Sequence, residues 1–259
     1  MQTSMPRAYC VELLGTFGLV FFSAGVVCLN YLAAPIDQPP GTSPLNLHQP
    51  GLVGVALAQG LIFAVLLTLT APVSGGYLNP AIAVTLWAFN RLETRRLPWL
   101  LGAQLMGAFL AGMCLRFTFE LGLLRTAQFG TPHVNLQTYN TLEQATLFAG
   151  VGVELVLTFF LVFAIFGAVP ERSRLAGWGG GAVLAAAVLV GFPLTGAALK
   201  PARWFGTVLW EAWLGRLSIG RSGPFSDIIV YLAGPILGAL LAGAFCFLIY
   251  LPATRDEKK

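Results

Sequence analysis

The chain has 259 residues, of which 56% are hydrophobic and only 10% are charged, with a formal net charge of +4. A soluble globular domain carries about 25% charged residues, so lipid rather than water is the expected surrounding of this much apolar surface. The Lys and Arg residues mostly fall in short segments between apolar runs. They do not form the clustered basic patch that nucleic-acid binding requires, and no nucleic-acid partner is expected.

Six apolar stretches are long enough to cross a bilayer, which takes roughly 20 residues per helix. They cover residues 8–29, 52–71, 98–119, 148–169, 177–194 and 228–251. Two shorter apolar pieces, 80–89 and 201–210, are too short to span. Each follows a turn that contains Gly and Pro, a pattern typical of re-entrant segments. We therefore expect an all-α membrane protein with six transmembrane helices and two re-entrant half-helices.

Lys and Arg are unevenly distributed between the loops on the two sides of the predicted membrane. With a cytoplasmic N-terminus, nine of them lie inside and four outside, and the external segment 30–51 has none. This is the bias that cytoplasmic loops show. We expect both termini to be cytoplasmic and the membrane to be the cell membrane (plasma or inner).

Three patterns in the first half recur, in the same order, in the second half. The matched pairs are VELLGTFGLVF with VELVLTFFLVF, SGGYLNPA with TGAALKPA, and GAFLAG with GALLAG. Eight of the eleven positions in the first pair are identical. The repeats then span about 8–119 and 148–251 within one channel domain, 1–259. Since each repeat has three spans, the second must enter from the opposite side, which predicts an inverted repeat with its functional site near the midplane.

Each half also carries one acid inside its first span, Glu12 and Glu154. A carboxylate at the bilayer centre costs about 2.5 kcal/mol or more, so it needs hydrogen-bond donors. Backbone N–H groups of a re-entrant loop, which no helix satisfies, are natural partners. We interpret both acids as supports of these loops, with a proton relay as the alternative.

The two central motifs, with the residues after the second one, resemble the paired signature loops of the aquaporins, the major intrinsic protein family. The first motif ends in Asn79-Pro80-Ala81, whereas the second reads Lys200-Pro201-Ala202. The resemblance covers nearly the whole chain, Glu12 and Glu154 included. It implies one pore per subunit, usually a homotetramer in the lipid bilayer, and passive conduction of water, glycerol or similar uncharged solutes.

The first motif suits a half-helix that begins at mid-membrane. Asn79 is a good N-cap, and Pro80 fits the first turn because it has no N–H to leave unpaired. The positive ends of two such helices would repel cations, including hydrated protons, as in aquaporin-type pores. Asn79 would donate a hydrogen bond to a passing water or hydroxyl group.

The resemblance also implies a selectivity filter. The family has an Arg just after the second motif, and Arg203 matches it; the three remaining filter positions are Gln59, Val188 and Ala197. Gln59 replaces an aromatic residue and Val188 replaces a His of the water-specific pattern, which favours solutes larger than water. The glycerol subgroup usually has an Asp after its Arg, and this chain has Trp204 there, so the subgroup stays open.

The largest departure is Lys200, where the family usually has Asn. Burial and the positive end of a half-helix both disfavour a charged ammonium. Three possibilities remain open: Lys200 donates to solutes as Asn would, stays charged and blocks the pore or admits anions, or turns aside to pair with Glu154.

Other chemistry is poorly represented. His48 and His133 lie in predicted external loops, and the four cysteines are interpreted as small buried hydrophobes. We find no nucleophile with a base and no acid pair, so we expect neither an enzyme nor a cofactor or metal site. Two other classes are alternatives: a non-conducting structural or adhesion protein closed by Lys200, and a secondary active transporter. The second lacks an acidic coupling site facing the pore.

Overall fold

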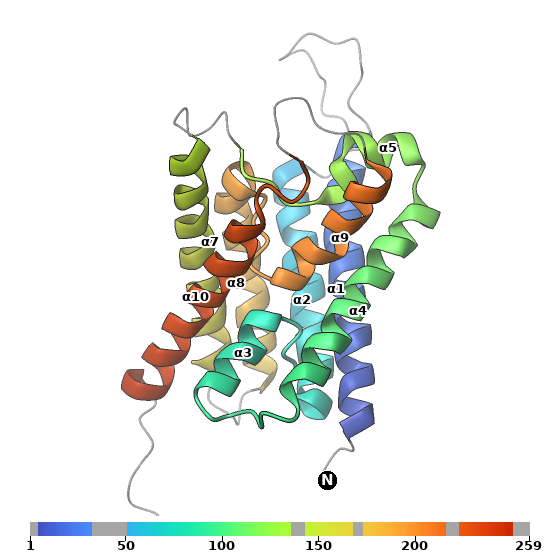
Figure 1. Ribbon diagram of the computed structural model, residues 1–259. Helices are drawn as coiled ribbons and strands as arrows, with labels where there is room; N and C mark the ends of the chain where they lie inside the picture. The colour runs from blue at the N-terminus through green and yellow to red at the C-terminus, as the bar shows by residue number, and fades with distance from the viewer. Residues whose placement is uncertain (1–4, 33–50, 136–142, 168–172, 216–222, 251–259) are drawn as a thin grey trace, which may run out of the picture.

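Six long helices form a bundle in the computed structural model, which describes residues 5–32, 51–135, 143–167, 173–215 and 223–250 (Figure 1). They are α1 (Met5–Leu32), α2 (Gly51–Ser74), α4 (Leu97–Thr118), α7 (Glu143–Phe166), α8 (Ser173–Thr195) and α10 (Ile228–Ala244), which continues into a π-helical turn, η3 (Phe245–Tyr250). Within the described ranges, these six are long and apolar enough to cross a membrane. The predicted all-α class with six transmembrane helices is therefore confirmed.

Two shorter helices, α3 (Pro80–Ala88) and α9 (Pro201–Leu214), penetrate the bundle from opposite ends (Figure 1). Helix α3 lies toward the end that holds the N-terminus, and α9 lies toward the other end. Helix α9 continues four residues beyond the predicted 201–210 and ends at Leu214. The apolar pattern stops at Glu211, but the helix does not. A short helix, α5 (Leu121–Thr126), and a 3₁₀ turn, η1 (Gln128–Gly130), follow α4 and were not predicted.

Close helix packing depends on glycine at several helix crossings. At the α2–α8 crossing, a Cβ on Gly60 would lie 2.5 Å from the Gly181 carbonyl oxygen. Gly107 of α4 is pressed in the same way against Leu13 of α1, and Gly238 of α10 against Leu155 of α7. Small residues at such crossings allow backbones to approach in lipid, where van der Waals contact drives association.

Each half-helix also packs against a long helix of the opposite half, α3 against α10 and α9 against α4. These crossed contacts tie the two halves together around the centre of the bundle.

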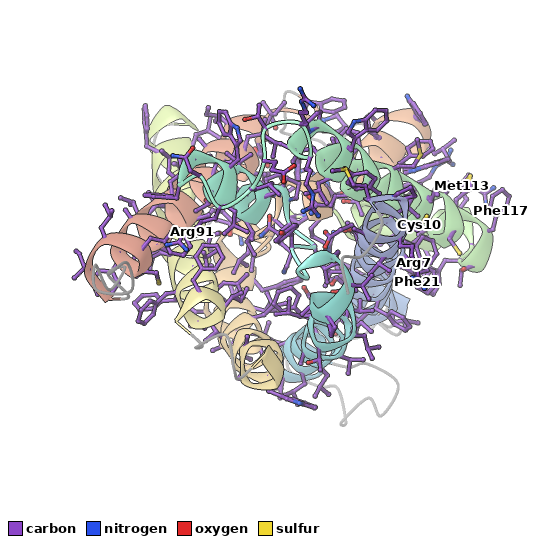
Figure 2. The ribbon with its side chains drawn as sticks, turned by 90° about the horizontal axis from the view of Figure 1, so that it is seen from below. Arg7, Cys10, Phe21, Arg91, Met113 and Phe117 are labelled. Carbon is purple, nitrogen blue, oxygen red and sulfur yellow. The ribbon has the colours of Figure 1, made fainter. Side chains whose placement is uncertain are left out.

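The outer face of the bundle carries large apolar side chains. Phe117 is 81% exposed and Phe148 is 78% exposed. Figure 2, which views the bundle from the N-terminal end, shows Phe117 projecting outward from α4. Many other large apolar side chains are exposed as well, and the six long helices are apolar enough to cross a membrane. This outer face therefore suits lipid, and the chain is an integral membrane protein.

The cysteines follow the predicted burial only in part. Cys28 and Cys246 are buried, Cys114 is half-buried, and Cys10 is exposed on the outer side of α1 (Figure 2). The sequence pattern could not separate these cases, because a lipid-facing position and a core position are equally apolar.

Candidate functional site

Two re-entrant loops lead from α2 into α3 and from α8 into α9, and both have unusual backbone conformations. In the first, φ is positive at Gly75, Gly76 and Leu78. In the second, φ is positive at Gly196, Ala197 and Leu199. Non-glycine residues seldom adopt this conformation, so Leu78, Ala197 and Leu199 require strong support from their surroundings.

Glu12 supplies that support for the first loop. Its buried carboxylate accepts hydrogen bonds from the backbone N–H groups of Tyr77 (2.9 Å) and Leu78 (2.8 Å). It also accepts from Ser74 Oγ (2.6 Å) and Gln104 Nε2 (2.8 Å). Ser74 Oγ has a second acceptor, the Thr70 carbonyl oxygen at 3.2 Å, but no other acceptor is found among the described residues for the two backbone N–H groups and the Gln104 amide. A buried donor left without a partner costs about 1–3 kcal/mol.

Glu154 makes nearly the same set of contacts to the second loop. It accepts from the backbone N–H groups of Ala198 (3.0 Å) and Leu199 (2.8 Å) and from Thr195 Oγ1 (2.7 Å). Both acids, interpreted as loop supports from the sequence, thus contact the loops directly. Their oxygens are engaged by these donors, an arrangement that does not resemble a chain of proton carriers.

Asn79 caps α3 and links the two loops. Its Oδ1 accepts from the N–H of Ala81 at 3.0 Å, while its Nδ2 donates to the Leu199 carbonyl oxygen at 3.1 Å. Pro80 occupies the first turn of α3 and is buried, as are Ala81 and Asn79 itself. The N-terminal ends of α3 and α9 therefore meet in the interior of the bundle, joined by a hydrogen bond from Asn79.

Lys200 precedes α9 in the equivalent place, with an extended backbone and only 3% of its surface exposed. Its side chain makes no capping hydrogen bond, because an ammonium has no acceptor. Pro201 and Ala202 follow it and are buried. The Nζ atom lies 4.8 Å from the centre of the Phe63 ring, in the geometry of a cation–π contact.

The predicted alternative in which Lys200 pairs with Glu154 is not the arrangement found. No ion pair within 4.0 Å joins Lys200 to a carboxylate of the described residues. The oxygens of Glu154 are already occupied by the loop donors. The ammonium instead lies over Phe63, one helical turn along α2 from Gln59.

The four predicted filter residues come from α2, α8, the second re-entrant loop and α9. All four are buried, and Val188 and Ala197 belong to the same apolar cluster as Phe63. Gln59 Nε2 is buried and has no hydrogen-bond partner among the residues that the structure describes. Neither Gln59 nor Val188 contacts Arg203 through a hydrogen bond.

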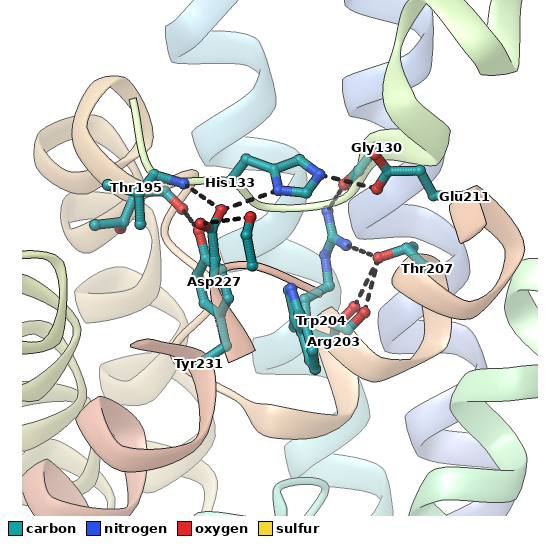
Figure 3. Close-up of polar contacts among 11 residues, drawn as sticks. Gly130, His133, Thr195, Arg203, Trp204, Thr207, Glu211, Asp227 and Tyr231 are labelled. Atoms are coloured by element: carbon teal, nitrogen blue, oxygen red, sulfur yellow. Dashed lines mark hydrogen bonds and ion pairs between the residues drawn. The ribbon is translucent and has the colours of Figure 1, made fainter. Parts of the chain in front are cut away.

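Arg203 is held toward the end of the bundle opposite the N-terminus. Its Nη2 donates to the Gly130 carbonyl oxygen at 2.7 Å, and its Nη1 lies 3.5 Å from Thr207 Oγ1 (Figure 3). Beside it, Trp204 is stacked on Tyr231 with ring centres 5.7 Å apart. The guanidinium is therefore fixed by a backbone carbonyl from the segment that follows α5.

One polar cluster at this end was missed by the sequence analysis. His133 lies between Glu211 and Asp227, with Nε2 2.8 Å from Glu211 Oε2 and Nδ1 3.1 Å from Asp227 Oδ2 (Figure 3). The three residues come from separate segments, and their spacing in the sequence carries no signal. The other histidine, His48, lies outside the described residues.

Comparison with known proteins agrees with this geometry. The major intrinsic protein family model matches residues 1–247. Aquaporin TIP4-4 of Zea mays is 36% identical over 242 residues, covering 92% of this chain and 84% of the relative. Aquaporin NIP1-1 of Zea mays is 31% identical over 252 residues, covering 95% and 76%.

Among solved structures, the X-ray structure of the aquaglyceroporin from Plasmodium falciparum shares the fold. Its TM-score is 0.75 at 21% identity, and the match covers 95% of this chain and 97% of the other. The chain therefore belongs to the major intrinsic protein family and is a membrane channel for water or small solutes rather than an enzyme.

Proposed function

We propose that each subunit conducts water and small uncharged solutes of the glycerol type passively, through a pore that passes between the starts of α3 and α9. The observation that carries this proposal is the junction of the two half-helices. Asn79 Nδ2 bonds to Leu199 O at 3.1 Å, and Lys200 follows directly with its ammonium unpaired by any described carboxylate. Helix N-termini and fixed donors at this point would repel cations while hydrogen-bonding neutral oxygens.

The filter composition supports a polar solute larger than water. Gln59 brings an amide whose Nε2 has no acceptor in the described part of the chain, and we expect it to bond a hydroxyl group of the solute. Val188 and Ala197 add a small apolar wall. A solute with hydroxyl groups on one side and carbon on the other matches such a lining. The Plasmodium neighbour is named an aquaglyceroporin, which agrees with this choice.

Lys200 acts in this proposal as the second central donor. It takes the place of an Asn that would both cap α9 and donate to the solute. Lys200 donates but caps nothing, so the start of α9 is richer in donors and poorer in acceptors than the start of α3. This asymmetry favours solutes whose oxygens accept hydrogen bonds. The competing function, a pore blocked by Lys200 or permeable to anions, rests on the positive charge of the same group.

Further parts of the proposal rest on the family and the topology. We assign residues 8–119 and 148–251 to two inverted repeats of a single domain, and we place four such subunits in a homotetramer. Both termini are assigned to the cytoplasm of a cell whose plasma or inner membrane holds the channel. Arg203 would then stand toward the external mouth.

Stopped-flow light scattering on proteoliposomes tests the function. Water and glycerol gradients would be applied to wild type, Lys200→Asn and Lys200→Met. The controls are empty liposomes and Thr126→Ala, a substitution at an exposed position of α5. We expect wild type and Thr126→Ala to carry both solutes, and Lys200→Met to lose about ten-fold in glycerol flux if one donor worth about 1.4 kcal/mol is removed. Flux in Lys200→Asn but none in wild type would contradict the proposal and identify Lys200 as a block. Chloride flux that disappears in Lys200→Met would identify an anion pore.

A further inference from the structure

The segment from Gln128 to Asn135 crosses the end of the bundle opposite the N-terminus and touches both halves. Gly130 lies against α1, since a Cβ there would sit 2.7 Å from the Ala24 carbonyl oxygen, and its φ is +65°. Five residues later, the N–H of Asn135 donates to Leu194 O of α8 at 2.9 Å. Between these two points the segment offers the Gly130 carbonyl to Arg203.

His133 fastens the middle of this segment. Its side chain is 6% exposed and lies between two carboxyl groups that are 4% exposed, Glu211 of α9 and Asp227 at the start of α10. Asp227 Oδ2 also accepts from the N–H of Val134 at 3.1 Å. The imidazole therefore bridges α9 and the residue that precedes α10 (Figure 3).

The number of donors decides the protonation state that this bridge needs. An ionised carboxylate can only accept, and a neutral imidazole has one donor and one acceptor. Both ring nitrogens lie within 3.1 Å of carboxyl oxygens. With both acids ionised, the two contacts are satisfied together only when the imidazole is protonated and donates from both nitrogens.

The bridge is linked to Arg203 by short, direct paths. Arg203 and Glu211 lie on the same helix, α9, about two turns apart. The segment contacts α9 twice, through Gly130 O to Arg203 and through His133 to Glu211. Releasing His133 would remove one of these two contacts, and the segment would hold the Gly130 carbonyl less firmly against the guanidinium.

We propose that His133 is a positioning residue for the filter: as an imidazolium bridging Glu211 and Asp227, it holds the Gly130 carbonyl against Arg203, and loss of its proton loosens the filter. Among the described residues, the charged groups that face this site are Glu211 and Arg203 from α9, Asp227 from the turn before α10, and Arg125 of α5, which donates to Leu214 O beyond Glu211. The effect on flux rests on the proposed function.

The first test compares glycerol and water permeability in proteoliposomes at about pH 6 and about pH 9, on either side of the ordinary range of histidine. In wild type the ratio of glycerol to water permeability should change by about three-fold or more, as expected for loss of a charge-assisted hydrogen bond. In Glu211→Gln the ratio should stay constant, because the introduced amide can donate to a neutral ring nitrogen. In His133→Gln it should stay near the alkaline wild-type value, and Thr126→Ala should behave as wild type.

The inference is overturned if conducting wild type shows the same ratio at both pH values, or if the pH response survives in His133→Gln. A second readout does not require conduction. The chain has two histidines, so ¹⁵N-histidine NMR of the His48→Gln protein in nanodiscs reports His133 alone. We expect a doubly protonated ring at about pH 7, and faster proton exchange of the Arg203 guanidinium in His133→Gln. A neutral ring, or unchanged Arg203 signals, would overturn the inference, and this test also works in a protein that conducts nothing. Lack of conduction would by itself reject the proposed function.

Discussion

The two re-entrant loops share their scaffold but differ at the residue that begins each half-helix. In both, a buried glutamate from the first helix of its half accepts two successive backbone N–H groups and one hydroxyl. Both half-helices then begin with proline. However, Asn79 caps α3 with its side chain, whereas Lys200 caps nothing.

This difference separates what builds the loop from what acts in it. The loop conformation depends on a glutamate that lies on another helix, so the residue at the start of the half-helix can change without removing the support. An Asn at an N-cap contributes about 1 kcal/mol, much less than the donors gathered by Glu12 or Glu154. The second half can therefore carry Lys200 in the same architecture, with a different chemistry at the centre.

The largest expected effect comes from removing the glutamates. Glu12→Ala removes an acceptor from four donors and Glu154→Ala removes one from three; in each set the hydroxyl keeps a backbone carbonyl as a second acceptor. At about 1–3 kcal/mol per group, each change should cost several kcal/mol, with Glu12→Ala the more damaging. Thermal unfolding of the purified protein in detergent would measure the order of the two. Glu93→Ala, at an exposed position, is the control and should unfold at the same temperature as wild type. If the Glu154→Ala protein were less stable than the Glu12→Ala protein, the number of donors would not be the deciding factor.

A smaller effect should appear where the halves are packed alike. A methyl group at Gly107 would press on the Leu13 carbonyl, and one at Gly238 on the Leu155 carbonyl. Overpacking of this kind typically lowers the free energy of unfolding by about 1–3 kcal/mol. We therefore expect Gly107→Ala and Gly238→Ala to lower the unfolding temperature by similar amounts.

Gly102 provides the matched control in the same helix as Gly107. A Cβ at Gly102 meets nothing within 4 Å, so Gly102→Ala should be neutral or stabilise α4 by up to about 1 kcal/mol. If Gly107→Ala were as harmless as Gly102→Ala, the close α1–α4 crossing would not contribute to stability, and the similarity of the two halves would be confined to their loops.

Much of the fold was predictable, because lipid leaves a strong signal in a sequence. Apolar length located six helices, and the Pro after Asn79 and after Lys200 located the starts of α3 and α9. The donors of Glu12 and Glu154 were also predictable in kind, since a buried carboxylate and an unpaired loop backbone have few other partners available.

The rest depends on contacts between distant segments of irregular backbone. Helix α5 is only six residues long and has too few turns to show a period. The bridge from His133 to Glu211 and Asp227 spans more than 75 residues. The position of the Lys200 ammonium over Phe63 was also out of reach, because several directions were open to a long flexible side chain and the sequence does not distinguish them.

The smallest expected effect concerns one pair of equivalent loop positions, Gly76 and Ala197. Each lies two residues after the hydroxyl residue that donates to the glutamate. Both have positive φ, +66° and +49°, a conformation that costs a non-glycine residue roughly 1–2 kcal/mol. Ala197→Gly should relieve part of this strain and raise stability by up to about 1 kcal/mol after the entropy that glycine loses on folding. Ala198→Gly, at the neighbouring residue, where φ is not positive, should lower stability instead. Thermal unfolding in detergent would measure the stability of both variants. If Ala197→Gly lowers stability as much as Ala198→Gly does, the packing of the Ala197 methyl in its apolar cluster outweighs its backbone strain. That methyl, rather than the loop conformation, would then explain why the two halves differ here.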